Sequence, residues 1–291
     1  MSMLRGKTIA LSIGNAIDRE KLGLPEREVN RVLFTLCTAL IREGCQILYA
    51  GDLRAGGYTM SMFQFLAGTY AGEGITPFMN VLPEPAVRRL DFETLFAAAK
   101  AAHGVAEINL VLSGNLYPVQ RIGDELRIGD KRSARPRIRN GEQLTTFLQG
   151  FPVSTQGFTD ARRIVSELAD GRVAMGGKMG IIDLPGDQYG GAMPGIAEEA
   201  ILTLQLGKAF IPLAAFGGAA RDAAIALELL SVDARTPRGS QVPSYEESMQ
   251  QLRQMQEALP PSLLAPLRRL ANNEGAEDLA QDVVEVLREW I

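Results

Sequence analysis

Short apolar segments that end in glycine and lead into helical sequence recur along this chain, and they restrict its fold more than any other feature. Their apolar residues are continuous rather than alternating, which is typical of strands buried on both faces. Strand and helix in alternation indicate a parallel sheet with right-handed crossovers. We therefore predict a doubly wound, Rossmann-like α/β fold with helices on both faces of the sheet. The segments and their glycines are Thr8–Ile13 with Gly14, Gln46–Ala50 with Gly51, Arg172–Met175 with Gly176-Gly177, and Ala209–Phe216 with Gly217-Gly218.

Helical periodicity follows the first two of these strands. Apolar residues recur at helical spacing from Glu26 to Arg42, which predicts a long helix after the first strand. A second helix is predicted to begin at Gly56-Gly57, and Ile75–Leu82 is predicted to be another strand. These elements complete the first half of the expected sheet.

The composition is that of an ordinary globular protein. The 291 residues are 46% hydrophobic, and 30 Lys and Arg against 34 Asp and Glu give a net charge of -4. This acidic balance argues against duplex DNA as the default partner. Two cysteines, Cys37 and Cys45, are too few for a disulfide framework. Thr8–Ile17 is interpreted as a strand rather than a signal peptide, because charged residues follow it directly. We expect a cytoplasmic protein with no membrane-spanning helix.

The chain is predicted to divide near residue 232. Residues 1–232 form the Rossmann-like domain, and residues 244–291 form a C-terminal helical appendage after a linker marked by Pro237, Gly239 and Pro243. The appendage is predicted to hold three helices, at about Tyr245–Leu259, Ser262–Ala271 and Glu277–Trp290.

Residues 115–149 form a predicted insertion in that domain. Ile122–Gly129 is typical of a short hairpin, and the basic run Lys131–Arg139 follows it. Residues 130–140 hold five bases and one acid, whereas residues 244–291 hold nine acids and four bases. The basic run has no aromatic residue on which a base could stack, so we interpret it as a solvated loop. As a hypothesis, it meets the acidic C-terminal helices of a second copy, and high salt would weaken that contact.

The strand-end glycines predict a site for a phosphate-bearing ligand. In a doubly wound sheet, ligands bind at the carboxyl ends of the strands. Glycine lets backbone N–H groups approach a ligand, and the N-terminus of the following helix favours an anion. The competing interpretation is that tight turns need glycine for structural reasons. The glycines assigned to the site are Gly14, Gly51, Gly56, Gly57, Gly176, Gly177, Gly217 and Gly218.

A further helix start lies at Pro194-Gly195, where proline suits the first helical turn. Glu198 and Glu199 follow within that helix. Adjacent helical residues point about 100° apart, so only one of these carboxylates can face a ligand at the helix start. The helix dipole also favours acids there, which is the structural interpretation of both.

Polar residues near the strand ends are candidates to complete the site. Lys178 follows Gly177 and is predicted to meet phosphate as a point charge. Arg54 and Asn15 are also assigned to the ligand, with surface placement and a turn cap as their respective alternatives. Asp18 is interpreted as a loop acid.

Four of these segments resemble the SLOG superfamily. It groups the lonely-guy (LOG) cytokinin-activating phosphoribohydrolases, DNA-processing protein A and the N-terminal domains of some TRPM channels. The likeness is greatest to the bacterial branch associated with TIR domains, whose members are regarded as sensors of nucleotide-derived signals. It covers roughly Lys7 to Leu230 and leaves the C-terminal helices outside. The segments are Tyr49–Gly57, Arg172–Lys178, Pro194–Ala200 and Phe216–Ala220.

The chain departs from the motif of the hydrolytic LOG enzymes, Pro-Gly-Gly-x-Gly-Thr-x-x-Glu. Gly195 and Glu199 match its third Gly and its Glu, but Ile196 replaces the Thr and Ala192-Met193 replace the first two glycines. The resemblance also implies a catalytic arginine, for which Arg162, Arg163 and Arg172 are all candidates. Residues 179–191 are interpreted as a possible lid.

The resemblance leaves three functions open. The first is a sensor that binds an NAD- or ADP-ribose-like nucleotide and couples binding to self-association or to a TIR-domain or other effector in bacterial signalling or defence. The alternative is an N-glycosidic nucleotide hydrolase, in which Glu199 or Glu198 is catalytic. The third is a nucleic-acid module, which the acidic charge disfavours. We expect a dimer or larger homo-oligomer, no obligatory cofactor and no metal. The single histidine, His103, and the lack of metal-ligand spacing also disfavour a serine hydrolase.

Overall fold

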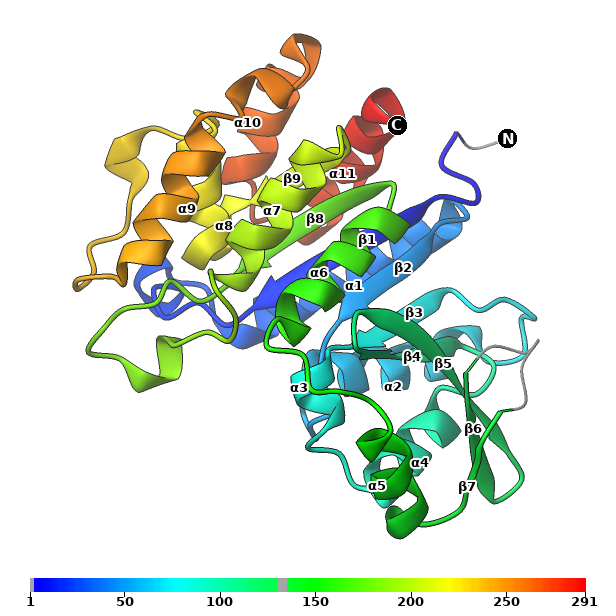
Figure 1. Cartoon of the computed structure of the whole chain (residues 1–291). Coiled ribbons are helices and arrows are strands. Elements are labelled where there is room, and N and C mark those ends of the chain that lie inside the picture. The colour runs from blue at the N-terminus through cyan, green and yellow to red at the C-terminus, as the bar shows by residue number, and fades with distance from the viewer. Residues whose placement is uncertain (1–2, 130–134) are drawn as a thin grey trace. The chain divides into compact units, whose positions relative to one another are not determined.

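The computed structural model describes residues 3–129 and 135–291 (Figure 1). Its contacts divide the chain into two compact units. Unit 1 comprises the N-terminal residues up to Ile47 together with Ser166–Ile291, and unit 2 is Leu48–Val165. The boundaries fall inside strand β2 (Gln46–Ala50) and helix α6 (Gly157–Leu168).

Unit 1 is built on three parallel strands in the order β1-β8-β9. These are β1 (Thr8–Gly14), β8 (Gly171–Gly176) and β9 (Ala209–Leu213). Gly14 of β1 lies opposite Gly176 of β8, and Met175 lies opposite Leu213 of β9. The register therefore brings the carboxyl ends of all three strands, with their glycines, to one edge.

Helices cover both faces of these strands. Helix α7 (Gly195–Gln205) connects β8 to β9, and α8 (Gly218–Ala226) follows β9. Helix α1 (Glu26–Arg42) buries the apolar face that its periodicity predicts, and it packs against the C-terminal helix α11 (Ala276–Trp290). In Figure 1, α7 lies in front of the strands, and α1 and α11 lie behind them. The predicted Rossmann-like α/β architecture is confirmed.

The C-terminal helices of unit 1 are α9 (Pro243–Arg253), α10 (Leu264–Asn272) and α11. All three pack on the rest of the unit: α9 contacts α7 and α8, α10 contacts β9, and α11 contacts α1. Short 3-10 helices connect the elements of this unit: η1 (Glu20–Leu22), η2 (Pro185–Asp187), η3 (Ala214–Phe216), η4 (Val232–Ala234), η5 (Gln256–Ala258) and η6 (Pro261–Leu263).

Unit 2 holds strands in the order β7-β6-β5-β4-β3-β2. Helices α2 (Tyr58–Tyr70), α3 (Glu84–Val87), α4 (Phe92–Ala101) and α5 (Gly141–Gln149) accompany them. Its remaining strands are β3 (Phe78–Leu82), β4 (Ala106–Leu112), β5 (Asn115–Ile122), β6 (Glu125–Ile128) and β7 (Arg137–Ile138).

The sheet of unit 2 departs from the all-parallel prediction. β3 and β4 are parallel, but β4, β5, β6 and β7 pair antiparallel. A two-residue turn at Ser113-Gly114, both with positive φ, reverses the chain after β4 because such turns match the twist of a hairpin. The predicted hairpin at 122–129 is therefore part of a longer antiparallel edge, and β4 is a strand that the glycine-and-helix pattern did not indicate.

The boundaries of several elements also differ from the prediction. The strand predicted at Ile75–Leu82 begins at Phe78, and the strand predicted at Ala209–Phe216 ends at Leu213, where η3 begins. None of the helices within residues 3–129 and 135–291 combines the length and apolar character needed to cross a membrane.

Candidate functional site

The carboxyl ends of β1, β8 and β9 and the starts of α7 and α8 form the candidate site in unit 1. Gly14, Gly176-Gly177 and Gly217-Gly218 all lie in the turns at this edge. The Gly177 N–H donates to the Gly14 carbonyl at 3.1 Å, and the Ala219 N–H donates to the Gly177 carbonyl at 3.1 Å. The structure thus brings the predicted glycine turns together as one hydrogen-bonded cluster.

These glycines are required by the packing of one turn on another. A Cβ added to Gly14 would lie 2.9 Å from the Gly177 Cα, and one added to Gly176 would collide with the Gly14 carbonyl oxygen. Gly176 and Gly218 also have positive φ, +67° and +63°. The structural interpretation therefore accounts for these glycines. Their presence alone does not indicate a ligand, so a ligand site has to be inferred from the helix starts.

The start of α8 is filled from within the chain. The Gly218 N–H donates to Asp18 Oδ1 at 2.8 Å, and Asp18 is 2% exposed. A carboxylate there accepts the helix N–H and repels a second anion. Asp18 is thus a buried helix cap rather than a loop acid, and its partner 200 residues away gives no local signal of this role. The predicted phosphate contact at Gly217-Gly218 has a carboxylate in its place.

The start of α7, in contrast, has no capping side chain at its cap position, where Pro194 stands. The first N–H groups of an α-helix have no partner within the helix. At this start Gly195 is half-buried, whereas Ile196 and Ala197 are buried, so the Gly195 N–H group is the one nearest the surface, where an anion would approach. The Ile196 side chain lies against Gly177, where an added Cβ would be 2.6 Å from Cδ1. An apolar residue thus occupies the place of the motif's threonine.

Glu199 is bound to a buried arginine. Arg172 of β8 is 1% exposed, and its Nη1 lies 3.1 Å from Glu199 Oε2. The rest of the guanidinium is held by three hydroxyl groups: Ser12 Oγ at 2.6 Å, Thr203 Oγ1 at 2.9 Å and Ser166 Oγ at 3.0 Å. Of the three candidate arginines, Arg172 thus contacts the motif glutamate, and it does so inside the protein. Glu198, the neighbouring acid, is 7% exposed.

The segment after Gly177 is a fixed turn rather than an open lid. Asp187 is fully buried and accepts N–H groups from Met179, at 3.1 Å, and Ile181, at 2.9 Å. Lys178 is exposed and donates from Nζ to the Gln188 carbonyl at 2.6 Å. The ammonium retains two further protons with which it can meet an anion. Asn15 is exposed immediately after Gly14.

This turn is joined to the residues before α9. The Ile182 N–H donates to the Ser240 carbonyl at 2.9 Å, and the Val242 N–H donates to the Gly180 carbonyl at 3.0 Å. The Gln241 side chain adds a bond to the Met179 carbonyl at 3.0 Å. A direct hydrogen-bonded path therefore runs from the Gly-Gly-Lys turn to the C-terminal helices.

A buried ion pair secures the same junction. Arg238 binds Asp222 of α8 through two hydrogen bonds, at 2.6 and 2.8 Å, and Tyr245 of α9 donates to the same carboxylate at 2.5 Å. Burial, followed by the Asp222 charge, raises the pKa of Tyr245 well above its ordinary value, so the phenol keeps its proton. Helices α8 and α9 are thus fixed to each other beside the site.

The remaining predicted site residues, Gly51, Arg54, Gly56 and Gly57, lie together in unit 2 in the loop before α2. Gly57 stands at the cap of α2. The Arg54 side chain is 81% exposed, and its Nε lies 2.7 Å from Asp52 Oδ2. The hydrogen bond and the charge of Asp52 raise the pKa of Arg54. The structure therefore agrees with the alternative interpretation, in which Arg54 is a surface residue.

Other chemistry is poorly supported in the described part of the chain. No group of three or more His, Cys, Asp or Glu residues there is placed to hold a metal ion. Burial raises the pKa of Cys37 and of Cys45 to about 12, which leaves both thiols protonated and weakly nucleophilic at neutral pH.

The SLOG cluster2 family model matches residues 3–275. The chain belongs to the SLOG cluster2 family. No curated protein matches it significantly. Membership of this SLOG family indicates nucleotide-related binding or processing. The match includes α9 and α10, so these helices lie inside the SLOG cluster2 region and not beyond it as the resemblance implied.

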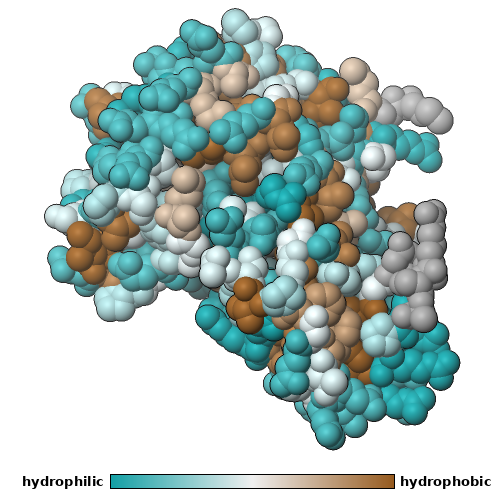
Figure 2. Space-filling view, in the orientation of Figure 1, coloured by the Kyte–Doolittle hydropathy of each residue, from teal (hydrophilic) through white to brown (hydrophobic). Residues whose placement is uncertain are grey.

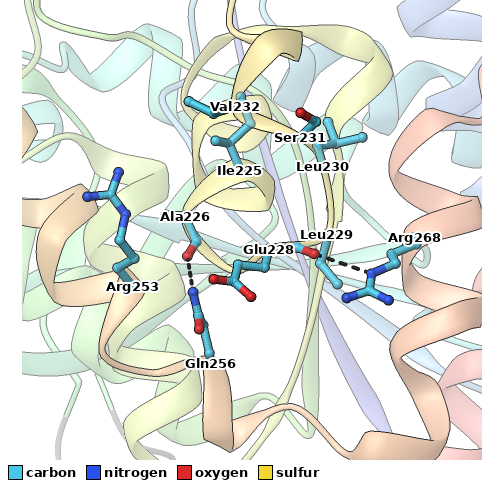
Figure 3. Close-up of a pocket in the computed structure, with 10 residues that line it drawn as sticks. All are labelled: Ile225, Ala226, Glu228, Leu229, Leu230, Ser231, Val232, Arg253, Gln256 and Arg268. Atoms are coloured by element: carbon cyan, nitrogen blue, oxygen red, sulfur yellow. Dashed lines mark hydrogen bonds between the residues drawn. The ribbon is translucent and has the colours of Figure 1, made fainter.

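One hollow of this SLOG protein lies at the far end of α8 from the glycine turns. Its volume is about 540 Å³, and Figure 3 shows Arg253 and Arg268 on opposite sides of Glu228. Arg268 Nε donates to the Glu228 carbonyl at 3.3 Å, and Gln256 Nε2 donates to the Ala226 carbonyl at 3.0 Å. None of the predicted site residues lines this hollow.

Proposed function

We propose that this SLOG protein binds a nucleotide-derived small molecule, of the NAD or ADP-ribose class, and acts as a sensor. The observation that carries the proposal is the N-terminus of α7, where Pro194 makes no side-chain cap, beside a glycine cluster whose other helix start is filled by Asp18. A phosphate group suits such a helix start because the free N–H groups and the helix dipole both favour an anion. Lys178, exposed after Gly177, supplies a positive charge at the same edge.

Binding is better supported than hydrolysis of the N-glycosidic bond. The glutamate that matches the hydrolase motif has its Oε2 in an ion pair with a buried arginine, and its side chain is only 13% exposed. With that oxygen engaged inside the protein, the carboxylate is poorly placed to activate an attacking water molecule. The ligand is therefore expected to be released chemically intact.

The output of the sensor is proposed to pass through the C-terminal helices. The hydrogen bonds from Gly180 and Ile182 to the segment 240–242 join the ligand edge to α9. A ligand that alters the Gly177-Lys178 turn would act on this junction and so on self-association or on an effector chain, such as a TIR-domain protein in bacterial defence. A ligand can act in this way only if the junction has two arrangements and the ligand binds them with different affinities.

Gly195→Asp is expected to abolish nucleotide binding, by at least about a hundredfold in Kd, while Gly195→Asn weakens it far less. The two side chains are nearly equal in size, and both suit a helix start. Only the aspartate adds a negative charge, which repels the phosphate. Titration calorimetry of both variants with ADP-ribose and NAD measures the difference.

The thermal stability of the two variants is the control, because an acid in the first helical turn is itself favourable. Both are expected to unfold within a few degrees of the wild type. Equal affinity of Gly195→Asp and the wild type for a nucleotide would remove α7 from the binding site.

A further inference from the structure

A cluster of arginines covers one side of the antiparallel strands of unit 2. The carboxylate of Glu125, a residue 6% exposed, binds Arg127 at 3.0 Å and Arg139 at 3.0 Å, and Arg137 Nε lies 3.8 Å away. Burial acts to raise the pKa of Glu125, but the hydrogen bonds from Arg127 and Arg139 outweigh it and the pKa is lowered. One ionised carboxylate thus holds three guanidinium groups side by side.

The strand register places these groups in a row. Gln120 of β5 lies opposite Arg127 of β6, which lies opposite Arg137 of β7. Arg135 extends the row because its Nη1 donates to Gln120 Oε1 at 2.9 Å. We call the surface of Arg127, Arg135, Arg137 and Arg139 the arginine face.

The arginine face carries a net positive charge. It holds four arginines, and residues 115–129 and 135–139 hold two acids, Asp124 and the buried Glu125. The side chains of Arg137 and Arg139 are 63% and 58% exposed. Figure 2 shows the end of unit 2 that carries β6 and β7 as strongly hydrophilic. Of the predicted basic run, Lys131 and Arg132 lie outside the described residues.

Helix α11 of unit 1 carries a matching acidic stripe. Asp278, Glu285 and Glu289 are exposed, and no ion pair engages them in the described residues. They are seven and four residues apart, which places them within roughly 40° of one another around the helix. The opposite side of α11, with Leu279 and Val283, is buried in the unit. We call Asp278, Glu285 and Glu289 the acidic stripe.

We propose that the arginine face of one copy docks on the acidic stripe of α11 of a second copy. The charges are complementary, and such pairs steer association and fix its orientation. A single-stranded nucleic acid fits less well, because the outward row holds no aromatic residue for base stacking. The nearby aromatic rings of Tyr117, Phe147 and Phe151 pack against one another instead.

The two surfaces are different patches of the same chain, so the contact joins head to tail. A heterologous contact either closes into a ring or continues as a filament. In an assembly that has not closed, the copy at each end keeps one surface free. The proposal stands independently of nucleotide binding.

Arg137→Glu and Glu285→Lys are each expected to weaken self-association about tenfold or more at 50 mM salt, measured by analytical ultracentrifugation. Arg137 has the longest contact to Glu125. Reversing the charge at position 137 therefore leaves the two short ion pairs of Glu125, with Arg127 and Arg139, in place. An equimolar mixture of the two variants is expected to associate more tightly than either alone. Arg253→Glu, an exposed arginine outside the arginine face, is the matched control and is expected to associate as the wild type does.

Three results would overturn the proposal. The first is a wild type that stays monomeric at low salt over a wide range of concentration. The second is self-association that neither high salt nor the two reversals weaken. The third is a mixture that associates no better than its components. Separately, tight, salt-sensitive binding of single-stranded RNA by the wild type but not by Arg137→Glu would assign the arginine face to nucleic acid instead.

Discussion

Arg172→Ala is expected to lower the free energy of unfolding by about 3–5 kcal/mol, because it leaves the Glu199 carboxylate without its buried partner. The guanidinium is 1% exposed and binds Glu199 and three hydroxyl groups, so water cannot replace it without disrupting the contacts between β8 and α7. Chemical denaturation followed by circular dichroism measures the loss.

The double variant Arg172→Met/Glu199→Met is the control for this prediction. It removes both charges together, so it is expected to cost much less than the sum of the two single substitutions. Additive losses would show that the two side chains do not act as a pair. In that case the argument against Glu199 as a catalytic base would fail as well.

Gly176→Ala is expected to destabilise the protein by about 3 kcal/mol or more, because its Cβ would collide with the Gly14 carbonyl oxygen and its φ of +67° is unfavourable for alanine. Gly56→Ala is a closely matched control. Gly56 has a φ of +74°, but an added Cβ there meets nothing within 4 Å. Its cost is expected to be only about 1 kcal/mol, which is the strain of the left-handed conformation.

The difference between these two variants in unfolding free energy isolates the packing of the glycine turns. Equal losses would mean that the turns at β1 and β8 relax to admit a side chain. The glycine cluster would then not be the rigid support on which the start of α7 depends.

The fold was largely predictable because its determinants are local. The apolar periodicity of 26–42 predicts α1 at its observed bounds, and continuous apolar strands before glycine predict β1 and β8. Strand β4 was not predicted, because Glu107 and Asn109 interrupt its apolar residues and because a hairpin turn, rather than a helix, follows it. The antiparallel edge depends on that turn and not on any pattern within the strands.

The site was less predictable because its decisive contacts join residues far apart in the sequence. Glu199 matches a motif position, but only the fold shows that its carboxylate forms an ion pair with Arg172. Asp18 is interpreted from sequence as a loop acid, and only the tertiary structure places it, buried, at the start of α8. Sequence therefore indicates which turns gather at one edge of the sheet, whereas tertiary structure decides which helix start there is capped by a carboxylate.

The most direct test of nucleotide sensing is a thermal-shift series with NAD, ADP-ribose, cyclic ADP-ribose isomers and nucleoside monophosphates, with chromatography of each mixture afterwards. A ligand present at a hundred times its Kd should stabilise the folded protein by about 2.7 kcal/mol, which gives a clear rise in Tm. We predict such a rise for at least one of these nucleotides, with the compound recovered intact. Release of the free base would establish a hydrolase instead, and the lack of any shift across the series would contradict nucleotide binding.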